Sequence, residues 1–144
     1  MALQLNRRYV QYFFEPMAES FEEGFWEGVK RRELVFQRCG QCREWHHPPR
    51  PMCHKCKSFD MRWEKSTGKG TVYSYVTFTR EVNPLYVVPF EVVLVEMDDE
   101  KPVRMIANML DTQPEDLYIG MPVELDFFDV SPKQPIPIFR KRKA

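Results

Sequence analysis

Short apolar runs separated by turn signals dominate the chain from about residue 66 onward. Alternation and a high content of β-branched and aromatic residues predict strands at 71–79, 90–97, 103–110, 123–130 and 136–139. The acids at 98–100 fall between two of these runs and are expected in a solvated hairpin turn, and 114–117 in a short helical turn. Strands of this number and length fit a small closed or partly closed barrel, for which the OB-fold is the leading candidate.

The hydrophobic residues that precede the strands have a different spacing, one that is typical of a helix. Hydrophobic side chains recur every four residues at Met17, Phe21, Phe25 and Val29, which predicts a helix over 15–31 with Pro16 in its first turn. Trp26 widens this apolar stripe, and Gly24 and Gly28 would let another surface approach closely. The stripe either faces the core of this chain or docks on another protein.

Between the helix and the strands lies a pattern with specific chemistry. The only four cysteines stand at Cys39, Cys42, Cys53 and Cys56, as two C-x2-C knuckles. Each knuckle supplies two thiolates, and a short hairpin would bring both pairs around one tetrahedral ion. We expect one structural Zn²⁺, because four protein thiolates leave no coordination position open for a catalytic water.

Three alternatives remain open at this site. An iron centre would accept the same four thiolates, and two disulfides would need an oxidising compartment. His46 or His47, between the knuckles, could replace one cysteine, whereas His54 is expected to be a solvent-facing spacer. Basic residues surround the cysteines, either to balance the charge of the thiolates or to bind phosphate: Arg38, Arg43, Lys55 and Lys57.

The segment 66–70, Ser-Thr-Gly-Lys-Gly, marks a change of composition. Its glycine spacing indicates a turn and lacks the pattern of a phosphate-binding loop. We therefore expect three parts: an N-terminal helical segment at 1–33, a zinc ribbon at 34–65 and an OB-fold domain at 66–144. The overall class is mainly β with an N-terminal helix.

The charge balance and the lack of a long apolar run at the beginning of the sequence limit the classes of function that the chain can have. Among the 144 residues, Lys plus Arg and Asp plus Glu are 21 each. A chain with this balance lacks the basic excess typical of nucleic-acid binders. Its beginning contains no long apolar run, so we expect no signal peptide or membrane span, and reduced, metal-bound cysteines indicate the cytoplasm.

Three segments together resemble a known family. They are F-W-E-G with L-V-F-Q-R-C-G-Q-C (25–28, 34–42), P-P-R-P-M-C-H-K-C-K-S (48–58) and W-E-K-S-T-G-K-G-T-V-Y-S-Y (63–75), later joined by G-M-P-V-E (120–124). In this order they resemble the OB-fold, acyl-CoA-associated proteins with a rubredoxin-like zinc ribbon, formerly a domain of unknown function. One departure is Lys57, where that family commonly has a glycine. Lys57 would have to adopt the tight knuckle geometry without the freedom of glycine.

This resemblance implies a role as an accessory subunit. Such proteins accompany thiolase-like or hydratase-like enzymes that act on acyl-CoA thioesters, and the chain is most similar to small subunits of two-component thiolases, including those of aromatic compound degradation. It implies a thiolase-like catalytic partner, two copies of each subunit, and CoA thioester bound only through the complex. No cysteine is left to serve as a nucleophile, so we expect no catalytic residue here.

Partner and ligand contacts can be assigned only as candidates. Surplus aromatic residues suggest docking surfaces at Tyr12, Phe13, Phe14, Phe21, Phe25 and Trp26. Arg50 or Arg104 could meet a CoA phosphate or a substrate carboxylate, although each could equally be an ordinary surface arginine.

A single-stranded nucleic-acid-binding module is the alternative function. Zinc ribbons and OB-folds both serve that purpose, and Tyr73, Tyr75 and Phe78 could stack bases. The basic end at 140–143 could contact phosphates, but the neutral net charge of the chain weighs against this function.

Overall fold

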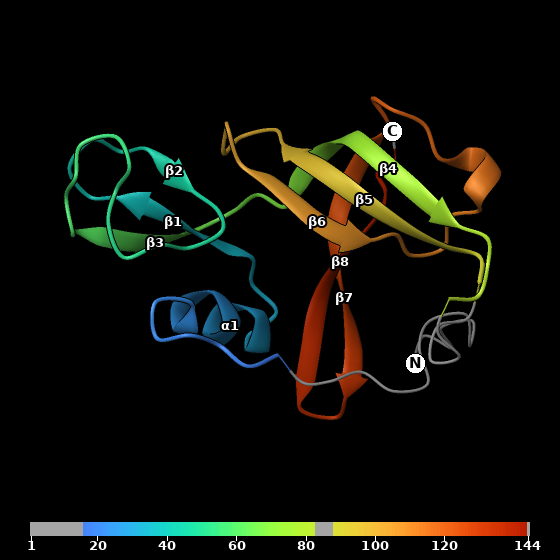
Figure 1. The fold of residues 1–144 in the computed structure, drawn as a ribbon, viewed down its shortest axis with the longest axis horizontal. Helices are drawn as coiled ribbons and strands as arrows, with labels where there is room; N and C mark the ends of the chain where they lie inside the picture. The colour runs from blue at the N-terminus through green and yellow to red at the C-terminus, as the bar shows by residue number, and fades with distance from the viewer. Residues whose placement is uncertain (1–15, 83–87, 144) are drawn as a thin grey trace.

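The computed structural model of the chain describes residues 16–82 and 88–143. Helix α1 (Glu23–Lys30) precedes a three-stranded sheet of order β2-β1-β3, and a five-stranded sheet of order β6-β5-β4-β7-β8 follows (Figure 1). The first sheet contains β1 (Val35–Cys39), β2 (Trp45–His46) and β3 (Met61–Lys65). The second contains β4 (Lys69–Phe78), β5 (Phe90–Met97), β6 (Arg104–Asn108), β7 (Pro122–Ser131) and β8 (Gln134–Lys141), with the 3-10 turn η1 (Pro114–Asp116) after β6. The mainly β class with an N-terminal helix is confirmed.

The five-stranded sheet curls without closing completely. Every paired strand in it is antiparallel, and β4 pairs with β5 along its length but with β7 only at residues 69–71. A bulge on β4 between Val72 and Ser74 increases the local bend. The two edge strands meet at one parallel bridge, where the Leu110 N–H donates to the Phe139 carbonyl at 2.7 Å. The barrel is therefore partly open, and its ladder of hydrogen bonds stops between β6 and β8.

The helix is shorter than the sequence predicts. It begins at Glu23, and the prediction that it begins at residue 15 with Pro16 in its first turn is wrong. A turn closes before it, since the Glu22 N–H donates to the Glu19 carbonyl and the Glu22 carboxylate accepts from the Glu19 N–H. Met17 is 94% exposed. Helices of this size are stable mainly through tertiary packing, and these earlier residues have no buried face to provide it. Among the described residues, no helix has the length and apolar character needed to cross a bilayer.

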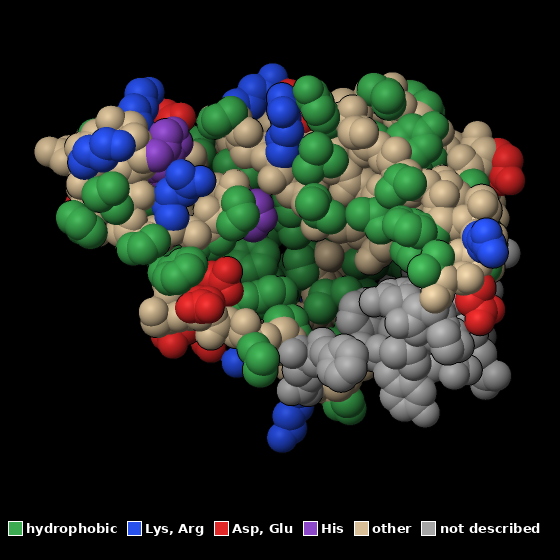
Figure 2. Space-filling view, in the orientation of Figure 1, with side chains coloured by type: hydrophobic (Ala, Val, Ile, Leu, Met, Phe, Trp, Pro, Cys, Tyr) green, Lys and Arg blue, Asp and Glu red, His purple; other side chains and the backbone are tan. Residues whose placement is uncertain are grey.

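One hydrophobic core joins the helix to both sheets. Phe25 and Val29 of α1 pack with Phe36 of β1 and with the barrel core that contains Val93 and Phe139. The half of the stripe within the helix therefore faces the core of this chain. At the C-terminal end of α1, Arg32 forms an ion pair with Asp129 near the tip of the β7–β8 hairpin. The helix lies between the ribbon and this hairpin (Figure 1), and the molecular surface is hollowed beside it, with hydrophobic side chains in the hollow (Figure 2).

The linker between the two sheets is held by the β5–β6 turn. The buried Glu100 carboxylate accepts from the Thr67 N–H at 2.9 Å, and Asp99 accepts from the Thr67 hydroxyl at 2.7 Å. Asp98 accepts from the Thr71 hydroxyl and from Arg142. The three acids, expected in a solvated turn, instead fix the position at which the chain passes from the ribbon to the barrel.

Replacing Glu100 with alanine should lower the free energy of unfolding by about 2 kcal/mol. The substitution removes a charge-assisted hydrogen bond from a buried position and leaves the Thr67 N–H without its acceptor. Urea denaturation measures the change. Glu100→Gln keeps an acceptor oxygen and should lose less; an equal loss in both variants would contradict the role assigned to this hydrogen bond.

Candidate metal centre

The two cysteine knuckles have the same backbone geometry. In the first, the Arg43 N–H donates to the Cys39 carbonyl and the Cys39 N–H to the Glu44 carbonyl. In the second, the Lys57 N–H donates to the Cys53 carbonyl and the Cys53 N–H to the Ser58 carbonyl. Each knuckle is thus a tight turn that presents two sulfur atoms to the same side, which is the local structure that the C-x2-C spacing predicts.

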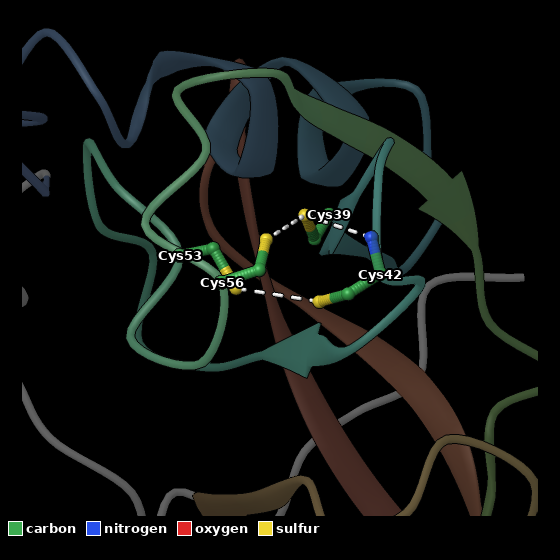
Figure 3. Close-up of side chains that lie close together, drawn as sticks. All are labelled: Cys39, Cys42, Cys53 and Cys56. Atoms are coloured by element: carbon green, nitrogen blue, oxygen red, sulfur yellow. Dashed lines mark hydrogen bonds between the residues drawn. The ribbon is translucent and has the colours of Figure 1, made fainter.

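The four sulfur atoms converge on one point, facing each other from the two knuckles (Figure 3). The Sγ atoms of Cys39 and Cys56 are 3.5 Å apart, those of Cys42 and Cys53 are 3.6 Å apart, and all four lie within 4.8 Å of one another. A tetrahedral zinc with Zn–S bonds of about 2.3 Å requires sulfur separations of about 3.8 Å. The four thiols fit this ion closely. Cys39 and Cys53 are fully buried, so an ion held here is part of the packed structure.

Backbone N–H groups favour the thiolate form of Cys39. At Cys42 a backbone hydrogen bond from Glu44 also lowers the pKa, but burial and the neighbouring sulfur atoms raise it to about 12. The Cys42 N–H donates to the Cys39 sulfur at 3.4 Å and is the main reason why the pKa of Cys39 falls to about 6. Burial opposes the shift, and a second N–H, from Gln41, adds to it. Because the thiolate is the metal ligand, this geometry prepares Cys39 to bind a cation.

The three histidines lie beside the metal centre without joining it. His54 is exposed, and its Nδ1 lies 3.1 Å from Nδ1 of the buried His46. His47 packs against the rings of Phe25 and Phe36, and burial lowers its pKa to about 4. The cluster of potential metal ligands found in the described part of the chain contains the four cysteines and no histidine.

The basic residues around the knuckles have partners within the chain. Arg38 and Arg43 both pair with Glu64 on β3, and Lys55 pairs with Glu44 at 3.1 Å. Lys57 donates to the His54 carbonyl at 2.9 Å. Side chains engaged in this way support charge balance around the thiolates more than a phosphate site. Glu64 gave no signal in the sequence, because only the pairing of β1 with β3 brings it to both arginines.

Lys57 adopts the backbone conformation that a glycine would accept without strain. Its φ is +64°, and Arg43, at the equivalent position of the first knuckle, has the same value. A residue with a side chain in this left-handed region is strained by about 1–2 kcal/mol. Glycine avoids this strain, but part of the gain is offset because glycine has more conformational freedom to lose on folding.

Lys57→Gly should therefore raise the free energy of unfolding of the metal-loaded protein by about 0.5–1 kcal/mol. Thermal unfolding with the metal content held fixed measures the gain. Arg43→Gly is the matched control. It relieves the same strain but removes an ion pair with Glu64, whereas Lys57→Gly removes only an exposed hydrogen bond to the His54 carbonyl, so the gain of Arg43→Gly should be smaller. A clear loss of stability in Lys57→Gly would contradict this explanation.

The other candidate residues are distributed over the surface and the core. Tyr12, Phe13 and Phe14 lie outside the described residues. Phe25 belongs to the core of this chain, Trp26 packs against that core, and Phe21 is partly buried. Their contact with a partner stays a prediction. The Arg50 side chain is exposed, and the backbone N–H of Arg50 donates to Gln37 Oε1 at 2.9 Å. Arg104 lies on β6, where it pairs with Glu96 at 3.1 Å and covers the ring of Tyr73.

The two arginines of the basic C-terminal end form ion pairs within the chain. Arg140 pairs with Glu124 and lies 3.5 Å from Asp126, while Arg142 pairs with Asp98 at 3.0 Å. These acids belong to β7 and to the turn after β5, so two of the four basic residues at 140–143 are balanced within the sheet.

Comparison with known proteins identifies both parts of the chain. Residues 26–62 match the family described as the ChsH2 rubredoxin-like zinc ribbon domain, and residues 63–128 match the ChsH2 C-terminal OB-fold domain. A solved chain titled "Ltp2-ChsH2(DUF35) aldolase" superposes with a TM-score of 0.81 at 36% identity, covering 88% of this chain and 98% of that chain.

Two curated relatives add to this result. A probable enoyl-CoA hydratase alpha subunit of Thermomonospora curvata is 38% identical over 120 residues, which are 83% of this chain. The match spans only 37% of the length of that subunit. A DUF35 domain-containing scaffold protein of Methanocaldococcus jannaschii is 33% identical over 105 residues, covering 71% of this chain and 73% of the scaffold protein. The chain therefore belongs to the DUF35 family, with a ChsH2-type rubredoxin-like zinc ribbon followed by an OB-fold domain.

Proposed function

We propose that this chain is a non-catalytic accessory subunit of an acyl-CoA-processing enzyme, braced by one structural zinc. The observation that carries the proposal is the similarity over 98% of a DUF35 chain whose title joins it to an aldolase. The hydratase alpha subunit among the relatives supports the same class of reaction. All four cysteines of the sequence meet at the metal centre, so the nucleophile of any acyl transfer would come from the partner.

Within this class we infer a thiolase-like catalytic partner, with two copies of each subunit. The support is the resemblance of the knuckle, P-P-R, G-K-G-T-V-Y-S and G-M-P-V-E segments to small subunits of two-component thiolases. The accessory chain would brace the catalytic subunit and help to shape its acyl-CoA site.

Arg50 is the better of the two candidates for contact with CoA or a carboxylate. Its exposed side chain makes no ion pair with any residue that the structure describes, whereas Arg104 already pairs with Glu96. An arginine without an ion pair can bind a phosphate without first breaking an interaction within the chain, so its binding is more favourable.

Affinity purification from the native host tests the proposal. The tagged full chain should recover an acyl-CoA enzyme at fixed stoichiometry, with about one zinc per chain by native mass and metal analysis. Identification of that enzyme would also name the reaction. Recovery of the chain without an enzyme, bound instead to nucleic acid that salt releases, would reject the proposal in favour of the nucleic-acid-binding alternative.

A further inference from the structure

The outer face of the five-stranded sheet is unusually apolar. On β5, Val93, Val95 and Met97 point into the core, while Phe90, Val92 and Leu94 alternate with them and face outward. Strands that are apolar on both sides are typical of sheets covered on both faces. Within the described chain, only the inner face of β5 belongs to the hydrophobic core.

Strand pairing gathers these outward side chains into one patch. Leu94 lies opposite Ile106 on β6, Val92 opposite Val76 on β4, and Phe90 opposite Phe78. We call these six residues the outer apolar patch. Ile106 is 70% exposed and Val76 49% exposed, although both lie within regular strands. In Figure 2, hydrophobic side chains gather over the part of the molecule where Figure 1 places β4 and β5.

The chemistry of the patch favours a protein over a nucleic acid. In OB-folds, the second and third strands, here β5 and β6, often bind oligonucleotides by stacking bases on aromatic rings beside cations. Here the centre is aliphatic, and the Phe78 and Phe90 rings stack on each other at 4.7 Å. At the border, the Arg104 guanidinium lies 3.7 Å from the Tyr73 ring centroid and pairs with Glu96. The rings of Phe78, Phe90 and Tyr73 and the Arg104 cation are already engaged, and the charges of Arg104 and Glu96 cancel. This favours a complementary surface that is itself apolar and poor in charge.

We propose that the outer apolar patch is the surface on which the acyl-CoA-processing partner subunit packs, through an apolar area of that subunit. This inference rests on the proposed function, which supplies the occupant: a chain of nearly the same extent as this one is joined to an aldolase in a solved structure. The patch is where this chain exposes apolar side chains across three adjacent strands, as the centre of a stable protein interface requires.

The test compares two exposed isoleucines in the full chain. Ile106→Glu places a charge on the most exposed side chain of the patch, on the edge strand β6. Ile119→Glu places the same charge in the loop before β7, where the wild-type side chain is 68% exposed. The probe is the acyl-CoA enzyme that affinity purification identifies, and its binding to each variant of the full chain is measured. Ile106→Glu should raise the Kd of the complex about 100-fold or more, and Ile119→Glu should leave it within about threefold. Zinc content and thermal unfolding of both variants should match the wild type. Val76→Glu, on β4 at the other side of β5, should repeat the loss.

Three other outcomes would each overturn a different part of the inference: the docking surface, the identity of the partner, or the proposed function. If the wild type binds the enzyme and Ile106→Glu binds equally well, the docking surface is wrong while the accessory function stands. If the isolated chain is a dimer that Ile106→Glu dissociates without weakening the enzyme complex, the patch belongs to a second copy. If the wild type binds no acyl-CoA enzyme, the proposed function fails and this inference fails with it.

Discussion

Cys53→Ser should abolish metal binding and unfold the ribbon. Cys53 is fully buried, and the protein offers no other cysteine to replace it. In small zinc-finger peptides the apparent binding free energy of structural zinc is about 10–16 kcal/mol, and it acts as folding free energy. The stability of a whole domain is only about 5–15 kcal/mol. Loss of one of four ligands therefore removes more than the small ribbon can replace by packing.

Tryptophan fluorescence reports directly on the unfolding of the ribbon. The three tryptophans of the chain, Trp26, Trp45 and Trp63, all lie in α1 or the ribbon strands and pack against the core there. Cys53→Ser, or a strong chelator added to the wild type, should shift their emission to longer wavelength and release about one ion per chain. Amide protection in β5 should persist, because that strand pairs on both sides within the other sheet.

His54→Ala is the matched control for the metal centre. His54 stands between two ligands but is exposed, and its imidazole lies against His46, so the variant should keep the ion and the native fluorescence. A chelated protein with unchanged fluorescence would show that the ribbon folds without metal. Metal analysis of the purified protein also separates zinc from the iron that four thiolates could hold.

Gly24→Leu should detach α1 from the ribbon and lower the free energy of unfolding by about 3 kcal/mol, the upper part of the usual range for overpacking. A Cβ atom at Gly24 would lie 2.2 Å from the indole of Trp63, so the helix or the ring must move. On an exposed helical surface the same change would be favourable, because leucine has a higher helix propensity than glycine. Urea denaturation followed by circular dichroism measures the loss.

Glu27→Leu tests the same helix on its exposed side. The Glu27 side chain is 60% exposed and pairs only with Lys30 among the described residues. This variant should change stability by no more than about 0.5 kcal/mol. Equal losses in the two variants would mean that leucine disturbs the helix itself and that close contact between Gly24 and Trp63 is unimportant.

The contrast between the helix and the knuckles shows how far local pattern can be trusted. The period of four at Met17 to Val29 predicts a helix twice as long as the one that forms. Helical periodicity states only which side chains could share a face; the extent of the helix depends on whether that face finds a surface to cover. Phe25 and Val29 find the ribbon and the barrel core, and Met17 does not.

The knuckles and strands were determined by the sequence itself. C-x2-C turns and β-rich runs are local, so their residue types specify the knuckle geometry, the set of four cysteines and the strands of the five-stranded sheet. Lys57 is the clearest case: the missing glycine predicts a strained left-handed residue, and its φ of +64° confirms it.

Only the tertiary structure decided how these parts combine. Three features join residues that lie far apart in the sequence. They are the ion pair of Arg32 with Asp129, the hydrogen bond from Thr67 to Glu100 and the outer apolar patch. Long-range contacts depend on the curl of the sheet and on the orientation of the ribbon, which no local pattern encodes. The sequence therefore determined the set of four cysteines and the family, whereas packing determined which face of the barrel exposes apolar side chains.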